Sequence, residues 1–343
     1  FPTRRSSDLI NKWNGTSALT PSFFSTQFCN YLNATRGFHI KPTNLLNTRS
    51  TEMSLYIVSQ VLINPGDLVL VGQLSNYVAN MIFQQAGAKI KTVPVDDEGL
   101  DIGYINEHFI HESIRCIYIC SNRDYPTTIP LSTKRRLQLL HLAKTHGFAI
   151  IEDDFDHDFQ FEGSSMLPMA SADADGNVIY LGKLGQSLFP SFHTGFVVAP
   201  EQVITEANNY LQLLDTQGDL IQEQMLSELI SEGEIYRLKK KNIVTYKQRR
   251  DALCTLLNQH FANILDWQIP SGGLAMWLRF KNPISLVKLA EEAEKLDLFL
   301  PKTILYQNKN TCAIRFGYGH LNEEELKIVI EKLQQAYLQL VAV

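Results

Sequence analysis

The stretch Ala149-Ile150-Ile151-Glu152-Asp153-Asp154-Phe155-Asp156 joins a short apolar run to a cluster of carboxylates. Such a run is typical of a strand that is buried on both faces of a parallel sheet. In open sheets of this kind, ligands bind beyond the carboxyl ends of the strands. We therefore predict a strand over residues 149–153, with its acidic end at a binding site.

The segments on both sides of this stretch repeat an alternation of helix and strand. Strands are predicted at 68–71, 89–94, 114–120 and 178–181, and helices at 20–40, 55–63, 78–85 and 133–145. Strands that alternate with such helices imply right-handed βαβ crossovers and a mainly parallel sheet. Residues 203–261 are predicted to be mostly helical. After them, 267–279, 286–296, 311–318 and 323–338 form a strand, helix, strand, helix pattern, which indicates a smaller C-terminal α/β domain.

The length and composition agree with a globular protein of two domains. A chain of 343 residues exceeds the ~250–300 residues at which one core stops growing. Hydrophobic residues make up 45% and charged residues 20% of the chain, and no apolar run reaches the ~20 residues of a membrane span. We expect no membrane partner.

The net charge of −5 gives the chain no overall attraction for nucleic acid. The basic stretch 237–250 is either a nucleic-acid patch or a solvated helix face, and its helical spacing around apolar residues favours the second. The five cysteines are odd in number and scattered, which is typical of reduced thiols in a cytoplasmic protein. Cys116 and Cys120 share one face of a predicted strand, but no second pair completes a metal site, so we expect no metal.

Residues 1–9, Phe1-Pro2-Thr3-Arg4-Arg5-Ser6-Ser7-Asp8-Leu9, resemble the in-frame translation of a sequencing adapter. We expect them to be an artefact and the natural chain to continue upstream.

Four segments carry a family resemblance, and each lies near a predicted strand end or helix start. They are Thr48-Arg49-Ser50-Thr51-Glu52, Arg123-Asp124-Tyr125-Pro126-Thr127-Thr128, the acidic stretch 152–156, and Tyr180-Leu181-Gly182-Lys183-Leu184-Gly185-Gln186-Ser187-Leu188-Phe189-Pro190. Together they resemble the aminotransferase-like half of MocR/GabR transcriptional regulators, over residues 20–340. The resemblance implies the fold-type I architecture of pyridoxal-phosphate (PLP) proteins, with helices on both faces of the central sheet. It divides the chain into an N-terminal arm (10–47), a large domain (48–245) and a small C-terminal domain (246–343), and it implies a homodimer.

The same resemblance places Gln186 at the position of the Schiff-base lysine. An amide cannot form that bond, so the function depends on this position. Lys183 is the alternative amine, three residues upstream. Three residues of extended chain span roughly 10 Å, which would bring its amine in from a different place.

The other positions that the family uses for PLP are partly kept. Thr51 keeps a hydroxyl at a helix N-terminus for the phosphate, and Asp153 keeps the carboxylate for the pyridine nitrogen. Phe155 replaces a tyrosine and offers no donor to the ring hydroxyl of PLP. Asp124 replaces an amide that the family directs to the same hydroxyl. His193 replaces the phosphate-binding arginine.

Arg315, in the sequence Ile314-Arg315-Phe316-Gly317, matches the family's arginine for a substrate or effector carboxylate. The resemblance thus implies an effector-binding and dimerisation domain of a MocR/GabR-like regulator of the GntR family, catalytically inactive and with a degenerate PLP site. Its effector would be amino-acid-like, or another carboxylate. Residues 10–47 are too few for a winged helix, so DNA would be bound only by an upstream domain. The alternatives are a PLP-dependent aminotransferase-like enzyme that uses Lys183 or another lysine, and a cleft that binds a carboxylate without a cofactor.

Overall fold

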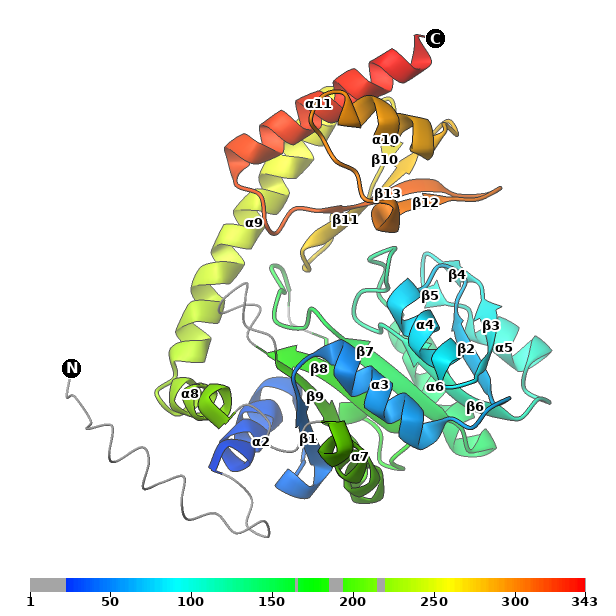
Figure 1. The fold of residues 1–343 in the computed structure, drawn as a ribbon, viewed down its shortest axis with the longest axis vertical. Helices are drawn as coiled ribbons and strands as arrows, with labels where there is room; N and C mark the ends of the chain where they lie inside the picture. The colour runs from blue at the N-terminus through cyan, green and yellow to red at the C-terminus, as the bar shows by residue number, and fades with distance from the viewer. Residues whose placement is uncertain (1–22, 164–165, 185–193, 215–219, 343) are drawn as a thin grey trace.

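The computed structural model describes residues 23–163, 166–184, 194–214 and 220–342. A larger and a smaller domain are joined by a long helix (Figure 1). The larger domain contains a seven-stranded sheet in the order β1-β9-β8-β7-β6-β2-β3. Its strands are β1 (Leu45–Thr48), β2 (Leu68–Gly72), β3 (Lys89–Val93), β6 (Ile114–Ile119), β7 (Ala149–Asp154), β8 (Val178–Leu184) and β9 (Thr194–Val198).

Neighbouring strands from β8 to β3 are all parallel, and β9 alone runs antiparallel to its two neighbours. The predicted mainly parallel α/β sheet is confirmed. The predicted strands at 68–71, 89–94, 114–120 and 149–153 correspond to β2, β3, β6 and β7, while β8 continues to Leu184, beyond the predicted end at 181. A small hairpin, β4 (Val95–Asp96) and β5 (Gly99–Leu100), lies apart from the main sheet.

Helices cover both faces of the large sheet. On one face, α3 (Thr51–Leu62), α4 (Tyr77–Gln85) and α7 (Glu201–Leu214) bury their apolar sides against the strands. On the other face, α5 (Ile102–His108) and α6 (Thr133–His146) cover one part. The remainder is covered by α2 (Phe23–Arg36) and α8 (Leu220–Ser231), which pack against each other.

The start of α3 is fixed by local chemistry. Ser50 is the N-cap, and its side chain accepts a hydrogen bond from the backbone N of Met53, which satisfies one free amide of the first turn. Gly195 of β9 lies directly against this turn, since a Cβ at that position would clash with the backbone of Ser50. The glycine therefore lets the antiparallel strand approach the N-terminus of α3.

The small domain packs a four-stranded antiparallel sheet, in the order β10-β11-β13-β12, against helices. Its elements are β10 (Leu265–Asp266), β11 (Ala275–Phe280), β12 (Leu305–Gln307), β13 (Cys312–Gly317), α10 (Leu286–Glu294) and α11 (Glu323–Val341). The strand predicted at 267–279 is confirmed as β11 only from residue 275 onward, because the preceding residues form the connection from β10 through Gly273, whose φ of +84° suits glycine. Side chains alternate along these strands, so one face enters the core and the other faces the large domain.

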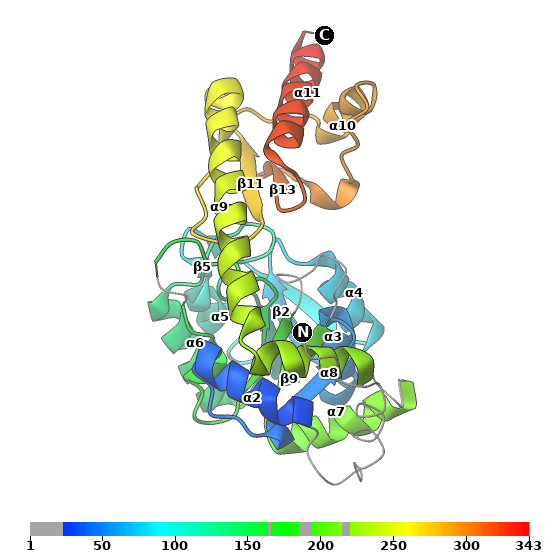
Figure 2. The ribbon, with the colours of Figure 1, turned by 90° about the vertical axis from the view of Figure 1, so that its left-hand side faces the viewer.

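Helix α9 (Glu234–Phe261) passes from the large domain into the small one (Figure 2). Its first part lies near α2 and α8, and its last turns enter the core of the small domain. The predicted boundary at 245/246 falls within this helix. A second connection pairs the backbones of the two domains, where Phe161 and Gly273 donate hydrogen bonds of 2.9 and 2.7 Å to the carbonyls of Ser271 and Phe159. Within the described ranges, no helix has the length and apolar character that crossing a bilayer requires.

Candidate functional site

Asp153 lies at the carboxyl end of β7, in the centre of the large sheet. Its Oδ2 accepts a 2.7 Å hydrogen bond from the hydroxyl of Tyr118 on β6, whereas its Oδ1 is buried and has no hydrogen-bond partner among the residues that the structure describes. Burial raises the pKa of Asp153 to about 7. A buried acceptor without a donor is uncommon in folded proteins, and it marks a place where a ligand N–H would fit.

Lys183 lies on β8, the next strand of the sheet. Its Nζ is 5.8 Å from the centre of the Phe155 ring, and burial lowers the pKa of this amine, although the charges of Asp153, Asp156 and Glu52 act in the opposite direction. No ion pair of Lys183 within 4 Å is found among the residues that the structure describes. An amine with a lowered pKa, next to an unsatisfied carboxyl, is a candidate functional group.

Asp124 follows β6 and is half-buried. Its Oδ2 accepts a 2.9 Å hydrogen bond from Thr127, and burial raises its pKa to about 7. The sequence predicts that Asp124 replaces an amide at this position. The raised pKa favours the protonated form of this carboxyl, which can also donate a hydrogen bond.

Arg315 lies on β13, on the face of the small sheet that is turned toward the large domain. Its guanidinium carbon is 4.6 Å from the centre of the Tyr125 ring, and that ring meets Phe155 edge-on at 6.2 Å. The Nε of Arg315 is buried without a hydrogen-bond partner, and the described residues include no carboxylate paired with it. Arginine stacked on an aromatic ring, with free donors, is suited to binding a carboxylate in a bidentate manner.

The structure thus brings together residues that are far apart in the sequence. A continuous aromatic wall, Phe155 and Tyr125, connects the amine of Lys183 at one end with the guanidinium of Arg315 at the other. Thr51 is the first residue of α3, beside the N-cap Ser50. The charge of its neighbour Glu52 acts on the pKa of Asp153 and of Lys183, which places this helix start at the same site. Gln186 and His193 lie outside the described residues.

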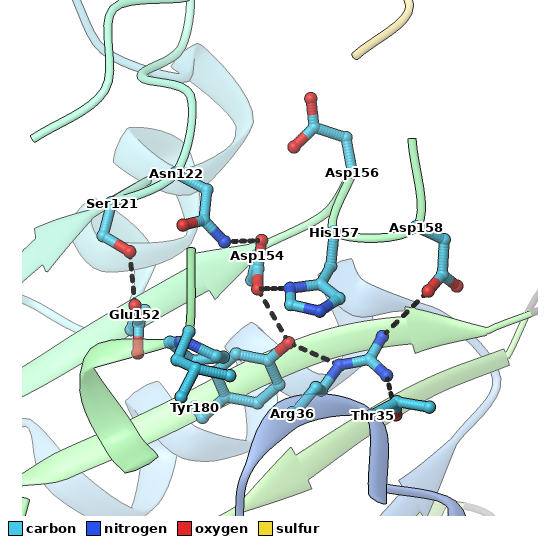
Figure 3. Close-up of polar contacts among 12 residues, drawn as sticks. Thr35, Arg36, Ser121, Asn122, Glu152, Asp154, Asp156, His157, Asp158 and Tyr180 are labelled. Carbon is cyan, nitrogen blue, oxygen red and sulfur yellow. Dashed lines mark hydrogen bonds and ion pairs between the residues drawn. The ribbon is translucent and has the colours of Figure 1, made fainter. Parts of the chain in front are cut away.

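A buried polar network behind the acidic end of β7 was not predicted from the sequence (Figure 3). Asp154 is its centre: His157 contacts its Oδ2 at 2.7 Å, and the hydroxyl of Tyr180 donates to the same oxygen at 2.9 Å. Charged neighbours, His157 first among them, hold the pKa of Asp154 below its usual range. The network continues to Arg36 on α2, which lies 3.6 Å from Asp158.

The sequence contained one sign of this network. Arg36 is the only charged residue of α2, and the structure buries it fully, so its charge must be compensated inside the protein. Lys239 of α9 also reaches Asp158, at 2.8 Å. The acidic stretch therefore serves two purposes: Asp153 faces the candidate site, while Asp154 and Asp158 connect the sheet to α2 and α9.

The site fits PLP only in part. The free Oδ1 of Asp153 is suited to the N–H of a pyridine ring, whose chemistry as an electron sink depends on such a partner. Phe155 offers an apolar ring surface without a donor, while the predicted position of the Schiff-base lysine, Gln186, lies outside the described residues. In the described part of the chain, Lys183 is the lysine whose charge acts on Asp153. Within the same residues, no group of three His, Cys, Asp or Glu side chains is arranged to hold a metal ion.

Comparison with known proteins places this geometry in a family. Residues 11–333 match the family described as aminotransferase class I and II. The chain is 26% identical over 316 residues to the "Probable rhizopine catabolism regulatory protein MocR" of Rhizobium meliloti, covering 90% of this chain and 62% of that protein. It is 25% identical over 305 residues to aromatic-amino-acid aminotransferase 1 of Thermococcus litoralis, covering 86% of this chain and 73% of the enzyme.

The fold is shared with solved aminotransferases. The crystal structure of an archaeal alanine:glyoxylate aminotransferase superposes with a TM-score of 0.87 at 24% identity, covering 97% of this chain and 85% of that one. Several of the related sequences are HTH-type transcriptional regulators, and this chain spans about 60% of their length. Its relatives therefore include both regulators and enzymes. The match over residues 11–333 and the shared architecture establish that the chain belongs to the class I and II aminotransferase family, with the fold-type I structure that the sequence predicts.

Proposed function

We propose that this chain is the effector-binding and dimerisation domain of a MocR/GabR-like transcriptional regulator of the GntR family, and that it catalyses no transamination. The observation that carries the proposal is Arg315, a partly buried arginine whose Nε is unsatisfied and whose guanidinium stacks on Tyr125. Gln186, at the family's lysine position, supports the loss of covalent PLP chemistry. The site would then bind a ligand rather than convert one.

The effector would be an amino-acid-like or other small carboxylate. A guanidinium in a partly desolvated position forms charge-assisted hydrogen bonds with a carboxylate, and these are worth about 1.5–3 kcal/mol each. The raised pKa values of Asp124 and Asp153 reduce the negative charge that would otherwise repel an anion there.

The wider setting follows from the relatives. We propose a cytoplasmic homodimer that contacts DNA through an upstream winged-helix domain, because the regulators among its relatives are HTH-type proteins and are longer than this chain. PLP would bind weakly at this site and would form no covalent bond with residue 186.

The first test measures carboxylate binding by isothermal titration calorimetry, with a panel of amino acids and 2-oxo acids. Arg315→Gln is expected to abolish binding of every ligand that the wild type binds, while Arg237→Gln, which changes an exposed arginine of α9 away from the site, should retain the carboxylate affinity. Equal affinities of the wild type and Arg315→Gln would contradict the proposal.

A second test concerns position 186. We expect Gln186→Lys to develop a visible absorbance band with PLP that the wild type lacks. Reduction with borohydride and peptide mapping would then locate the adduct at residue 186. A band in the wild type, with the adduct at Lys183, would exclude the inactive assignment.

A second candidate function rests on Lys183 itself. Its lowered pKa and its closeness to Phe155 and Asp153 favour a reactive amine, as a PLP-dependent aminotransferase-like enzyme would require. Lys183→Met should then remove both the absorbance band and any transaminase activity. With no band in the wild type, this candidate fails and the first stands.

A further inference from the structure

We propose that the cavity beside Arg315 binds the distal end of the effector, and that this end is positively charged. The effector would be an amino acid with a cationic side chain, of the lysine type. This inference rests on the proposed function, because it takes the carboxylate of the ligand to be held by Arg315.

The cavity lies between the large domain and the small sheet and has a volume of about 140 Å³. On the large-domain side, its walls are Asp97 and the loop 127–129. On the small-domain side they include two tryptophans, Trp267 and Trp277, together with Asp266 and Arg279. This volume can hold several water-sized groups, which is enough for an extended aliphatic tail.

The cavity is adjacent to Arg315 on the same sheet face. Trp277 of β11 and Arg315 of β13 are paired directly across two antiparallel strands, so their side chains point to the same side. Directly opposite residues have Cβ atoms about 5 Å apart, which is less than the length of an amino acid such as lysine. One small molecule can therefore contact Arg315 with its carboxylate and enter the cavity with its other end.

The loop that begins at Tyr125 is a second element that both Arg315 and the cavity contact. Arg315 stacks on Tyr125, and Thr127 and Thr128 of the same loop line the cavity. The loop is held by backbone hydrogen bonds of 2.7 Å from Thr128 N to Asp124 O and 2.9 Å from Asp124 N to Ile129 O. Thr128 has a φ of +64°, in the left-handed region that residues other than glycine seldom adopt. The cavity wall is thus held in one shape before a ligand binds.

The charges in the cavity favour a cationic group. Asp266 already has Arg279 at 3.8 Å and Lys281 at 3.7 Å. Asp97 lines the same cavity and has no ion pair within 4 Å among the described residues, although its neighbour Asp96 pairs with Arg135. An unpaired carboxylate beside indole rings is the combination that attracts ammonium groups, through charge and cation–π contacts. Arg279 would repel the cation only weakly, because its own charge is directed to Asp266.

The test compares ligands that differ only at the distal end. L-lysine and L-norleucine have the same carbon chain, and L-glutamate carries the opposite charge. In calorimetric titrations of the full chain at pH 7.5, L-lysine is expected to bind about tenfold more tightly than L-norleucine, and L-glutamate more weakly than both. Asp97→Asn should reduce the affinity for L-lysine to that for L-norleucine and leave L-norleucine unchanged. Glu107→Gln, which removes an exposed carboxylate from α5, is the matched control and should alter neither affinity.

The outcomes separate this inference from the proposed function. If L-norleucine binds as tightly as L-lysine and Arg315→Gln abolishes both, the carboxylate site stands and the cationic assignment of the cavity is overturned. A preference for L-glutamate also overturns it. If none of the three ligands binds and no other carboxylate does, the proposed function fails and this inference fails with it.

Discussion

The Nε of Arg36 donates a 2.9 Å hydrogen bond to the hydroxyl of Tyr180, and this bond joins helix α2 to strand β8 inside the protein. Arg36 is fully buried and also lies 3.6 Å from Asp158. Removing one member of a buried ion pair leaves its partner uncompensated. The bond therefore makes the packing of α2 dependent on a single charged side chain.

Arg36→Met is expected to lower the free energy of unfolding by about 3–5 kcal/mol, because Lys239 would be the ion-pair partner left to Asp158 among the described residues. Urea denaturation followed by circular dichroism measures the change. Arg237→Met is the matched control. It removes an exposed ion pair with Glu234 and should cost no more than about 0.5 kcal/mol. A loss below 1 kcal/mol for Arg36→Met would mean that the network does not hold α2.

Asp124 should give the stability of the protein a defined pH dependence. Burial raises its pKa to about 7 in the folded chain, from an ordinary value of 3.8. Between these values the folded chain keeps a proton that the unfolded chain has lost, so the free energy of unfolding falls as the pH rises from about 4 to about 7. The slope for one group is at most about 1.4 kcal/mol per pH unit, and above pH 7 the contribution is constant.

Asp124→Asn removes this contribution while keeping an oxygen for Thr127. The variant should therefore gain stability relative to the wild type as the pH rises from 5 to 8. Urea titrations at pH 5, 6, 7 and 8 would measure the difference. Parallel curves for the variant and the wild type would show that Asp124 ionises normally, as an exposed aspartate does.

Gly195 is expected to tolerate no side chain. A Cβ at this position would clash with the backbone of Ser50 at the start of α3, and neither strand nor helix end can move without loss of packing. We predict that Gly195→Ala lowers the free energy of unfolding by about 1–3 kcal/mol. Gly317→Ala on β13, whose nearest neighbouring atom is 4.0 Å away, should change it by about 0.5 kcal/mol or less. Similar melting temperatures for both variants would contradict the close contact.

Much of the large sheet could be predicted because its central strands are apolar runs between helices of the expected length. Strand β9 was not predicted, since an antiparallel strand needs no crossover helix and Gly195, a weak strand former, lies at its second position. Strand β1, of four residues, likewise lacks a periodic signal of its own.

The candidate site likewise contains residues that could be predicted from the sequence and contacts that could not. Asp153 and Arg315 could be proposed from motifs, and the structure places an unsatisfied polar atom on each. The pairing of Arg36 with Tyr180, 144 residues away, could not be predicted, because nothing local identifies the partner. Nor could the raised pKa of Asp124, which depends on how the fold surrounds its carboxyl group. The spacing along the chain between Lys183 and Gln186 could be read from the sequence. The surroundings of Lys183 could not, because these depend on neighbouring strands and loops.

Helix α9 couples the position of the small domain to helix α2 of the large domain. Its 28 residues form one rod of about 40 Å, with the core of the small domain at one end. At the other end, Tyr236 lies 5.5 Å from the ring of Tyr31 on α2. A tilt of the small domain by about 5° would move that end by roughly 3–4 Å, a displacement that would break a hydrogen bond there. Closure of the small domain over a bound carboxylate would thus displace the end of α9 that contacts α2, the first described helix of the chain.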